Sequence, residues 1–413
     1  MSKVVEAAVA ALDAKAKGFD GTAKFVIEDE GAVYIDANGA RAADDEADVT
    51  LTASRETFEG LLSGDVNPTM AFMTGKLQVD GSMGTAMKLE KHCCPRTARA
   101  MTPAPFNSFP GDPIPRADCF WLRAEDGLRL RAGLWRADRA TGTVLLFAGR
   151  TEYLEKYNQV ADELNAAGFD VLAIDWRGQG LSDRLLPDPR PGHIADFADY
   201  QRDVVEMVIA AQELDLPRPW HMLAHSMGGT IGYAALLGGL PVQSAVLSAP
   251  MFGIDLRKLP EGLALALANL LIRLGRGDLP APGAGGNDNF VLSAPYLDNL
   301  LTGDGARWGR AVAENATWPE VGIGGATSAW IRAALLECRR LAALPSPEVP
   351  ALIALGTQER VVSAPAIRAR LANWPGTQLL ELPDCHHEPM MERDPIRDAF
   401  MQAAIAHFRG HGR

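Results

Sequence analysis

Apolar residues recur at helical spacing at the start of the chain and at strand spacing soon after it. One apolar face predicts a helix over about residues 5–16. Residues 24–28 and 32–36 have the pattern of a hairpin around a Glu-Gly pair, and residues 47–53 alternate apolar and polar side chains as a half-buried strand does.

Short helices and one more strand complete this first segment. Ser54 precedes an apolar run to Leu62 and suits the N-cap of a helix. A second helical stretch follows Pro68, and residues 76–79 and 83–91 predict a last strand and a last helix. These elements together predict a small α+β unit.

From Ala117 onward, strands alternate with helical runs. The first two predicted strands join at Asp126-Gly127, a dipeptide that favours hairpins. The later predicted strands are 143–147, 169–174, 220–223, 351–355 and 377–382, and the predicted helices include 157–167, 197–214 and 230–237. This alternation predicts the α/β class, with a mostly parallel sheet covered by helices on both faces.

A proline-rich segment without hydrophobic periodicity lies between the two patterns, and it is typical of a linker. We therefore predict a small domain over residues 1–92, a linker over 93–116 and a large domain over 117–413. About a hundred residues separate a predicted strand that ends at Ser248 from the one that starts near Ala351, far more than a crossover helix needs. This excess predicts an inserted cap at about 253–345.

Charge and cysteine usage exclude some classes of protein. The chain has 40 basic and 52 acidic residues, a net charge of −12, which argues against nucleic acid as a partner. Most of that charge lies in the small unit, where 16 acidic residues stand against 9 basic ones over residues 1–92. The five cysteines are scattered, so we expect no structural disulfide and no metal site. No cofactor is expected either.

The chain has no sequence signal for membrane insertion. Glu6 interrupts the apolar start, so no signal peptide is expected. The longest apolar run, residues 262–272, is about half of the roughly 20 residues that a spanning helix needs. We expect a cytoplasmic protein with at most peripheral membrane contact.

Four stretches of the small unit resemble the sterol carrier protein 2 (SCP2) family. They are ADVTLTAS at 47–54, FEGLLSGDVNP at 58–68, MAFMTGKLQVDG at 70–81 and AMKLE at 86–90. The resemblance implies a fold with a hydrophobic tunnel for a fatty-acyl or sterol-like ligand and no catalysis. The same apolar residues also account for an ordinary core: Phe58, Leu61, Leu62, Met70, Phe72, Met73, Met83 and Met87.

A serine lies between a predicted strand and a helix rich in small residues in the large unit. The sequence is AHSMGG at 224–229, with Ser226 at its centre. A tight turn that raises a nucleophilic serine above a sheet needs small neighbours two residues away on each side, and Ala224 and Gly228 meet that need. Ala224 departs mildly from the usual first glycine of such an elbow.

An acid and a base follow Ser226 in the order that this fold requires. A serine hydroxyl needs a base, and the base needs an orienting carboxylate. Glu359 comes after the predicted strand at 351–355, and His387 comes after the next one. Asp384 is a less favoured orienter than Glu359, and His386 is a less favoured base than His387.

Residues 117–409 resemble the α/β-hydrolase superfamily, and within it the lysophospholipase and monoacylglycerol lipase branch. The resemblance rests on five sequence stretches: FAGRTEYLEKY at 147–157, DWRGQGLS at 175–182, AHSMGG at 224–229, GTQERVV at 356–362, and HE at 387–388 with MERDPIR at 391–397. By position, the resemblance implies Ser226 as nucleophile, Glu359 as acid and His387 as base. It also implies that the DWRGQGLS block is structural.

Two backbone amides are expected to form an oxyanion hole, those of Met227 and Arg150. The Arg150 side chain has two alternatives. An ion pair with Glu152 or Glu155 is the stronger expectation, and contact with a phosphate or carboxylate of a ligand is the weaker one.

We therefore expect a serine ester hydrolase that releases fatty acid from a lysophospholipid or a monoacylglycerol through an acyl-enzyme. The expected partners are this acyl-lipid substrate and a hydrophobic ligand in the small domain. Apolar residues of the cap suit an acyl chain, although they also suit the cap's own core. The alternatives are a serine peptidase or thioesterase on the same triad, and a non-catalytic lipid carrier.

Overall fold

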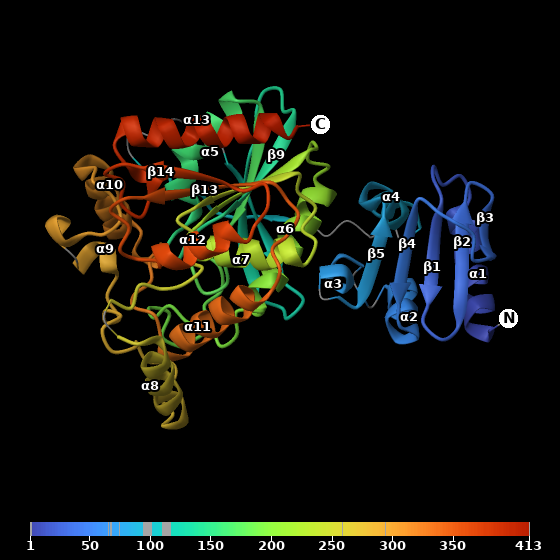
Figure 1. Ribbon diagram of the computed structural model, residues 1–413, viewed down its shortest axis with the longest axis horizontal. Coiled ribbons are helices and arrows are strands. Elements are labelled where there is room, and N and C mark those ends of the chain that lie inside the picture. The colour runs from blue at the N-terminus through green and yellow to red at the C-terminus, as the bar shows by residue number, and fades with distance from the viewer. Residues whose placement is uncertain are drawn as a thin grey trace. The chain divides into compact units, whose positions relative to one another are not determined.

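The computed structural model describes residues 2–64, 66, 68–73, 75–93, 101–109, 117–257, 259–293 and 295–412. These residues form two compact units: a small one before residue 94, and a large one built from residues 101–237 and 242–412 (Figure 1). Each unit is described by itself. The described part of the chain holds no helix with both the length and the apolar character needed to cross a membrane.

The small unit is a mixed sheet with helices packed against it. The strands run in the order β3-β2-β1-β4-β5, with β1 parallel to β4 and the other neighbours antiparallel. The elements are α1 (Lys3–Ala16), β1 (Ala23–Ile27), β2 (Gly31–Asp36), β3 (Gly39–Ala42), β4 (Val49–Ala53), α2 (Arg55–Ser63), α3 (Pro68–Met73), β5 (Leu77–Gly81) and α4 (Met83–Cys93). The sequence pattern predicted all of them except β3.

Local sequence explains how this unit begins its helices and fills its core. The Ser54 hydroxyl accepts a hydrogen bond from the Thr57 amide, so the predicted N-cap of α2 is confirmed. Phe58 and Leu61 of that helix lie in the core with residues of α1 and the sheet. The methionine side chains at positions 70, 73, 83 and 87 lie outside the described part of the structure.

The large unit is built on a long, mostly parallel sheet, as predicted. Its strand order is β14-β13-β12-β11-β9-β10-β8-β7-β6, with β8, β7 and β6 antiparallel to their neighbours. The strands are β6 (Thr102–Pro103), β7 (Ala117–Arg123), β8 (Arg129–Trp135), β9 (Gly142–Phe147), β10 (Phe169–Ile174), β11 (Trp220–His225), β12 (Ser244–Ser248), β13 (Ala351–Gly356) and β14 (Gln378–Leu382). The central strands are buried along their whole length, because helices cover both faces.

Helices α5 and α13 cover one face of this sheet, and α6, α7 and α12 cover the other (Figure 1). Their bounds are α5 (Asn158–Ala166), α6 (Asp199–Glu213), α7 (Met227–Leu237), α12 (Ala364–Ala372) and α13 (Asp394–Gly410). The 3-10 helices η1 (Leu154–Tyr157) and η4 (Pro389–Met391) lie next to the loops that carry the site.

The middle of the predicted linker, residues 101–109, differs from the expectation. Thr102 and Pro103 form β6, which pairs with β7 at the edge of the large sheet, and Pro105 accepts a hydrogen bond from the buried Arg131. Proline can occupy an edge strand because its missing N–H faces solvent. The described residues 101–109 therefore belong to the large unit, whereas residues 94–100 and 110–116 of the predicted linker lie outside the described residues.

Helices fill the long segment between β12 and β13, where the cap was expected. They are α8 (Glu261–Arg273), α9 (Phe290–Ser293), α10 (Gly305–Thr317) and α11 (Ser328–Ala343), with η2 (Tyr296–Asp298) and η3 (Pro319–Val321) between them. Leu265 of α8 packs against Leu335 of α11, whereas Leu263 and Leu270 on the other side of α8 are 57% and 52% exposed. The apolar residues of this segment thus divide between its own core and the surface.

Candidate active site

Ser226 lies where β11 ends and α7 begins, with no other residue between them. Its φ angle is +50°, in the left-handed region that a residue with a side chain rarely adopts. The Ser226 amide donates to the Ser248 carbonyl, and its own carbonyl accepts from the amides of Gly229 and Met251. The turn is therefore fixed by hydrogen bonds from three directions.

Close approach of neighbouring backbone explains the small residues around this turn. A Cβ atom on Gly228 would lie 2.2 Å from the Phe147 carbonyl oxygen and 2.5 Å from that of Ala148. A Cβ atom on Gly229 would lie 2.6 Å from the Cβ of Pro250. The loop after β9 thus touches the first turn of α7, as the pairing of β9 with β11 requires.

His387 connects Ser226 to Glu359. The distance from His387 Nε2 to Ser226 Oγ is 2.8 Å, and the distance from His387 Nδ1 to Glu359 Oε2 is also 2.8 Å. All three residues come from loops or turns at the ends of strands, although 161 positions separate Ser226 from His387. The structure therefore brings together the three residues that the sequence order picked out.

Glu359 is held as a carboxylate. Its second oxygen, Oε1, accepts hydrogen bonds from the amides of Val361 at 2.7 Å and Val362 at 3.0 Å. Burial alone would raise the pKa of Glu359, but the nearby His387 and these amides outweigh burial, so the pKa is lowered. A charged carboxylate fixes the ring orientation of His387 and favours a proton on Nδ1.

The less favoured candidates lie elsewhere. Asp384 is exposed, and the Nδ1 atom of His386 contacts Glu392 at 2.8 Å instead of reaching Ser226. His193 and His221 contact the hydroxyls of Thr327 and Ser244, in agreement with ordinary structural roles.

Side chains hold the loop after β9 in place through hydrogen bonds to its backbone amides. The Gly149 amide donates to Glu152 Oε2, and the Thr151 amide donates to Gln179 Oε1 at 2.7 Å. Thr151 has a φ angle of +66°, so the chain bends sharply directly after Arg150. These bonds fix the peptide groups on both sides of the Arg150 amide, one of the two expected oxyanion donors. The other, Met227, is the first residue of α7, where helical amides lack partners within the helix.

The prediction that Arg150 forms an ion pair with Glu152 or Glu155 is wrong. In the part of the chain that the structure describes, Glu152 pairs with Lys156 and Glu155 pairs with Arg131. The Arg150 guanidinium instead donates from Nη2 to the Gly324 carbonyl at 2.7 Å and lies 5.2 Å from the centre of the Trp330 ring. Burial lowers the pKa of Arg150 to about 10, so the group stays charged at neutral pH.

The DWRGQGLS block has structural contacts. Asp175 accepts from the buried Arg131 and from the amides of Leu154 and Leu181. A Cβ atom on Gly180 would lie 2.1 Å from the Asp175 carboxyl group. The glutamine of this block, Gln179, supports the loop after β9, a contact that sequence reasoning missed.

Comparison with known proteins agrees with this geometry. Residues 138–394, more than half of the chain, match the family described as serine aminopeptidase, S33. The chain belongs to the serine aminopeptidase S33 family. Residues 3–93 match the SCP-2 sterol transfer family, so this S33 hydrolase carries an SCP2 domain in front of its hydrolase unit.

Relatives of this S33 hydrolase include proteins that are named as lipid hydrolases. It is 34% identical to lysophospholipase L2 of Escherichia coli K12 over 300 residues, which cover 69% of this chain and 86% of the relative. It is 30% identical to monoacylglycerol lipase of Mycolicibacterium smegmatis over 154 residues, 37% of this chain and 52% of the relative. The crystal structure of a soluble variant of monoglyceride lipase from Saccharomyces cerevisiae matches with a TM-score of 0.57 at 16% identity, covering 74% of this chain and all of that chain. The predicted α/β-hydrolase fold is therefore confirmed.

The close approach at Gly228 gives a testable prediction for this S33 hydrolase. In Gly228→Ala, the added Cβ meets backbone carbonyls that cannot rotate away, so we expect a loss of about 1–3 kcal/mol in the free energy of unfolding. We also expect slower labelling of Ser226 by a fluorophosphonate. Gly262→Ala on the exposed side of α8 is the control, because nothing lies within 4 Å of its added Cβ. Unchanged stability and labelling in Gly228→Ala would contradict the tight elbow.

Proposed function

We propose that this protein is a serine ester hydrolase that releases fatty acid from a lysophospholipid or a monoacylglycerol through an acyl-enzyme. The observation that carries the proposal is the hydrogen-bonded chain Ser226–His387–Glu359 beside the loop after β9. The names of the Escherichia coli and Mycolicibacterium smegmatis relatives support the choice of a single-chain acyl lipid.

In the proposed mechanism, His387 Nε2 takes the proton of the Ser226 hydroxyl as Oγ attacks the ester carbonyl carbon. The backbone amides of Met227 and Arg150 donate to the oxyanion of the tetrahedral intermediate. His387 then gives its proton to the departing alcohol oxygen, and the carbon–oxygen bond breaks. A water molecule, deprotonated by His387, then attacks the acyl carbon. The bond to Ser226 Oγ breaks, His387 returns the proton to Oγ, and the fatty acid leaves. Glu359 stabilises the imidazolium in both halves.

The first experiment compares fatty-acid release from a lysophospholipid and a monoacylglycerol of equal chain length. We expect release by the parent chain and a fall in kcat of about ten-thousand-fold or more in Ser226→Ala, because the attacking oxygen is absent. Release that survives in Ser226→Ala would show that the serine assignment is wrong.

A peptidase remains the second candidate, because the matched family carries the description serine aminopeptidase. Both reactions pass through the same kind of tetrahedral intermediate, so the triad alone does not separate them. If neither lipid is hydrolysed while aminoacyl anilides are, and Ser226→Ala abolishes that cleavage, the peptidase assignment replaces the lipid one.

We infer that Arg150 favours a phosphate-bearing head group. Among the described residues its guanidinium has no carboxylate partner, and its Nε is buried without a hydrogen bond. A partly buried guanidinium with an unpaired Nε donor suits the phosphodiester of a lysophospholipid. Its position on the loop after β9 places it one residue from Gly149 and beside the cap segment at Gly324.

Replacing Arg150 by Met tests this role through substrate preference. We expect kcat/KM for the lysophospholipid to fall about 10- to 100-fold relative to that for the monoacylglycerol, since a hydrogen bond to a charged group contributes about 1.5–3 kcal/mol. The backbone amide is kept, so the monoacylglycerol reaction serves as the internal control. An equal loss on both substrates would mean that Arg150 supports the loop and does not recognise the head group.

We also propose that the SCP2 domain binds a second acyl ligand apart from the substrate. Family membership supports this assignment. The chain labelled at Ser226 with a long-chain phosphonate, which fills the hydrolase site, should still bind a fluorescent fatty acid. Complete loss of that binding on labelling would place the only ligand site in the hydrolase unit.

Contact with lipid aggregates is proposed to be peripheral, and the exposed leucines of α8 support this view. A cytoplasmic location is likewise only proposed.

A further inference from the structure

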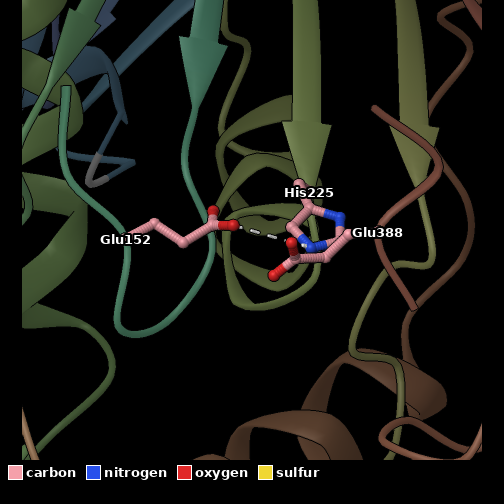
Figure 2. A group of neighbouring side chains, drawn as sticks. All are labelled: Glu152, His225 and Glu388. Carbon is pink, nitrogen blue, oxygen red and sulfur yellow. Dashed lines mark ion pairs between the residues drawn. The ribbon is translucent and has the colours of Figure 1, made fainter. Parts of the chain in front are cut away.

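A cluster of buried charged and imidazole side chains lies next to His387. Glu152, His225 and Glu388 place one ligand-type atom each within 4.8 Å of one another (Figure 2). Two carboxylates and an imidazole are a common set of metal ligands. In this protein, however, the Lys156 ammonium donates to Glu152 Oε1 at 2.8 Å and to Glu388 Oε1 at 2.7 Å. An internal cation therefore already bridges the two carboxylates.

We propose that Lys156 is a positioning residue for the serine chemistry. Its ammonium joins the loop that carries the Arg150 amide to the loop that carries His387. The proposal rests on the proposed function only in requiring that Ser226 is the nucleophile, and it does not depend on which ester is the substrate.

One end of the bridge holds the loop after β9. Glu152 binds Lys156 through Oε1, while its Oε2 accepts from the Gly149 amide and from the Tyr157 hydroxyl. A Cβ atom on Gly149 would lie 2.7 Å from Glu152 Oε2 and 3.0 Å from the His225 ring, so both side chains pack directly against the Gly149 backbone. The position of the Arg150 amide thus depends on the position of the Glu152 carboxylate.

The other end of the Lys156 bridge lies beside His387, the proposed base. Glu388 directly follows His387, and its amide donates to the Leu301 carbonyl at 2.8 Å. The ring of His225 lies 4.8 Å from the ring of His387, with its Nε2 3.9 Å from Glu152 Oε1. Lys156 therefore acts on the base through the neighbouring residue, and it contacts neither Ser226 nor His387 in the described structure.

Electrostatics make the ammonium necessary. The side chains of Glu152, Lys156 and Glu388 are 3%, 14% and 8% exposed. Burial alone would raise the pKa of Glu152, but Lys156, with smaller contributions from His225 and the Tyr157 hydroxyl, lowers it. Burial also lowers the pKa of His225, so this imidazole is neutral near pH 7 and cannot replace the ammonium. Without Lys156, two buried carboxylates would face each other with no cation between them.

Kinetics of Lys156 variants on a chromogenic short-chain ester test the proposal. In Lys156→Met we expect kcat to fall about 100-fold, as a shift of about 1 Å in a catalytic group can cause, while KM stays nearly unchanged because the bridge does not touch substrate. Lys156→Arg keeps both ion pairs and should recover most of kcat. The control Arg136→Met removes an exposed cation and should leave kcat as it is.

A double variant separates positioning from simple charge neutralisation. Lys156→Met with Glu388→Gln removes one carboxylate together with the ammonium, so thermal stability should recover in part while kcat stays low. Recovery of kcat along with stability, or wild-type kcat in Lys156→Met, would overturn the proposal. Loss of wild-type activity in a chelator, restored by a divalent metal, would also overturn it, because the cluster would then hold a metal ion.

Results that reject the proposed function differ from results that reject only the role of Lys156. If Ser226 is not the nucleophile, fluorophosphonate fails to label the wild-type chain, and Ser226→Ala retains activity on the ester. Labelled, active wild type together with an unaffected Lys156→Met rejects the positioning role alone.

Discussion

At Ser226 the backbone passes from strand to helix within one residue, in a left-handed conformation that costs about 1–3 kcal/mol for a residue with a side chain. Bonds to Ser248, Gly229 and Met251 hold it there. Because α7 starts at once, its first turn lies against the carbonyls at the end of β9, and only glycine fits at position 228. The nucleophile and the loop expected to supply an oxyanion donor are therefore adjacent as a result of one turn.

Around this turn, several carboxylates accept hydrogen bonds from backbone amides. Glu359 binds two amides of its own loop, Glu152 binds the amide of Gly149, and Asp175 binds the amides of Leu154 and Leu181. Each carboxylate also contacts a cation or a histidine. Loops at the ends of strands have few backbone partners of their own, and buried charged side chains give them fixed shapes.

The sequence could predict those parts of the site that depend on local patterns and strand order. Ser226 was visible because a short apolar strand, small residues and a helix adjoin, and Glu359 and His387 each follow a strand. The bridge from Lys156 to Glu388 spans 232 positions and has no local signal. The partner of Arg150 was wrongly predicted because Glu152 and Glu155 contact other cations, Lys156 and Arg131, whose approach depends on the folded sheet. Strand β3 is four residues long and lacks clear alternation, so the small sheet was predicted without it.

The short strand β6 helps the large unit to avoid self-association, because it pairs with β7 at the edge of the sheet. An uncovered strand edge exposes N–H and C=O groups that can pair with a second molecule and start aggregation. Residues 102–103 occupy this position beside β7, and Pro103 limits further pairing on the outer side. The first strand of the large unit thus also protects the edge of its sheet. A hydrolase fragment that began at Ala117 would expose β7, and it would be prone to aggregate even if its site were intact.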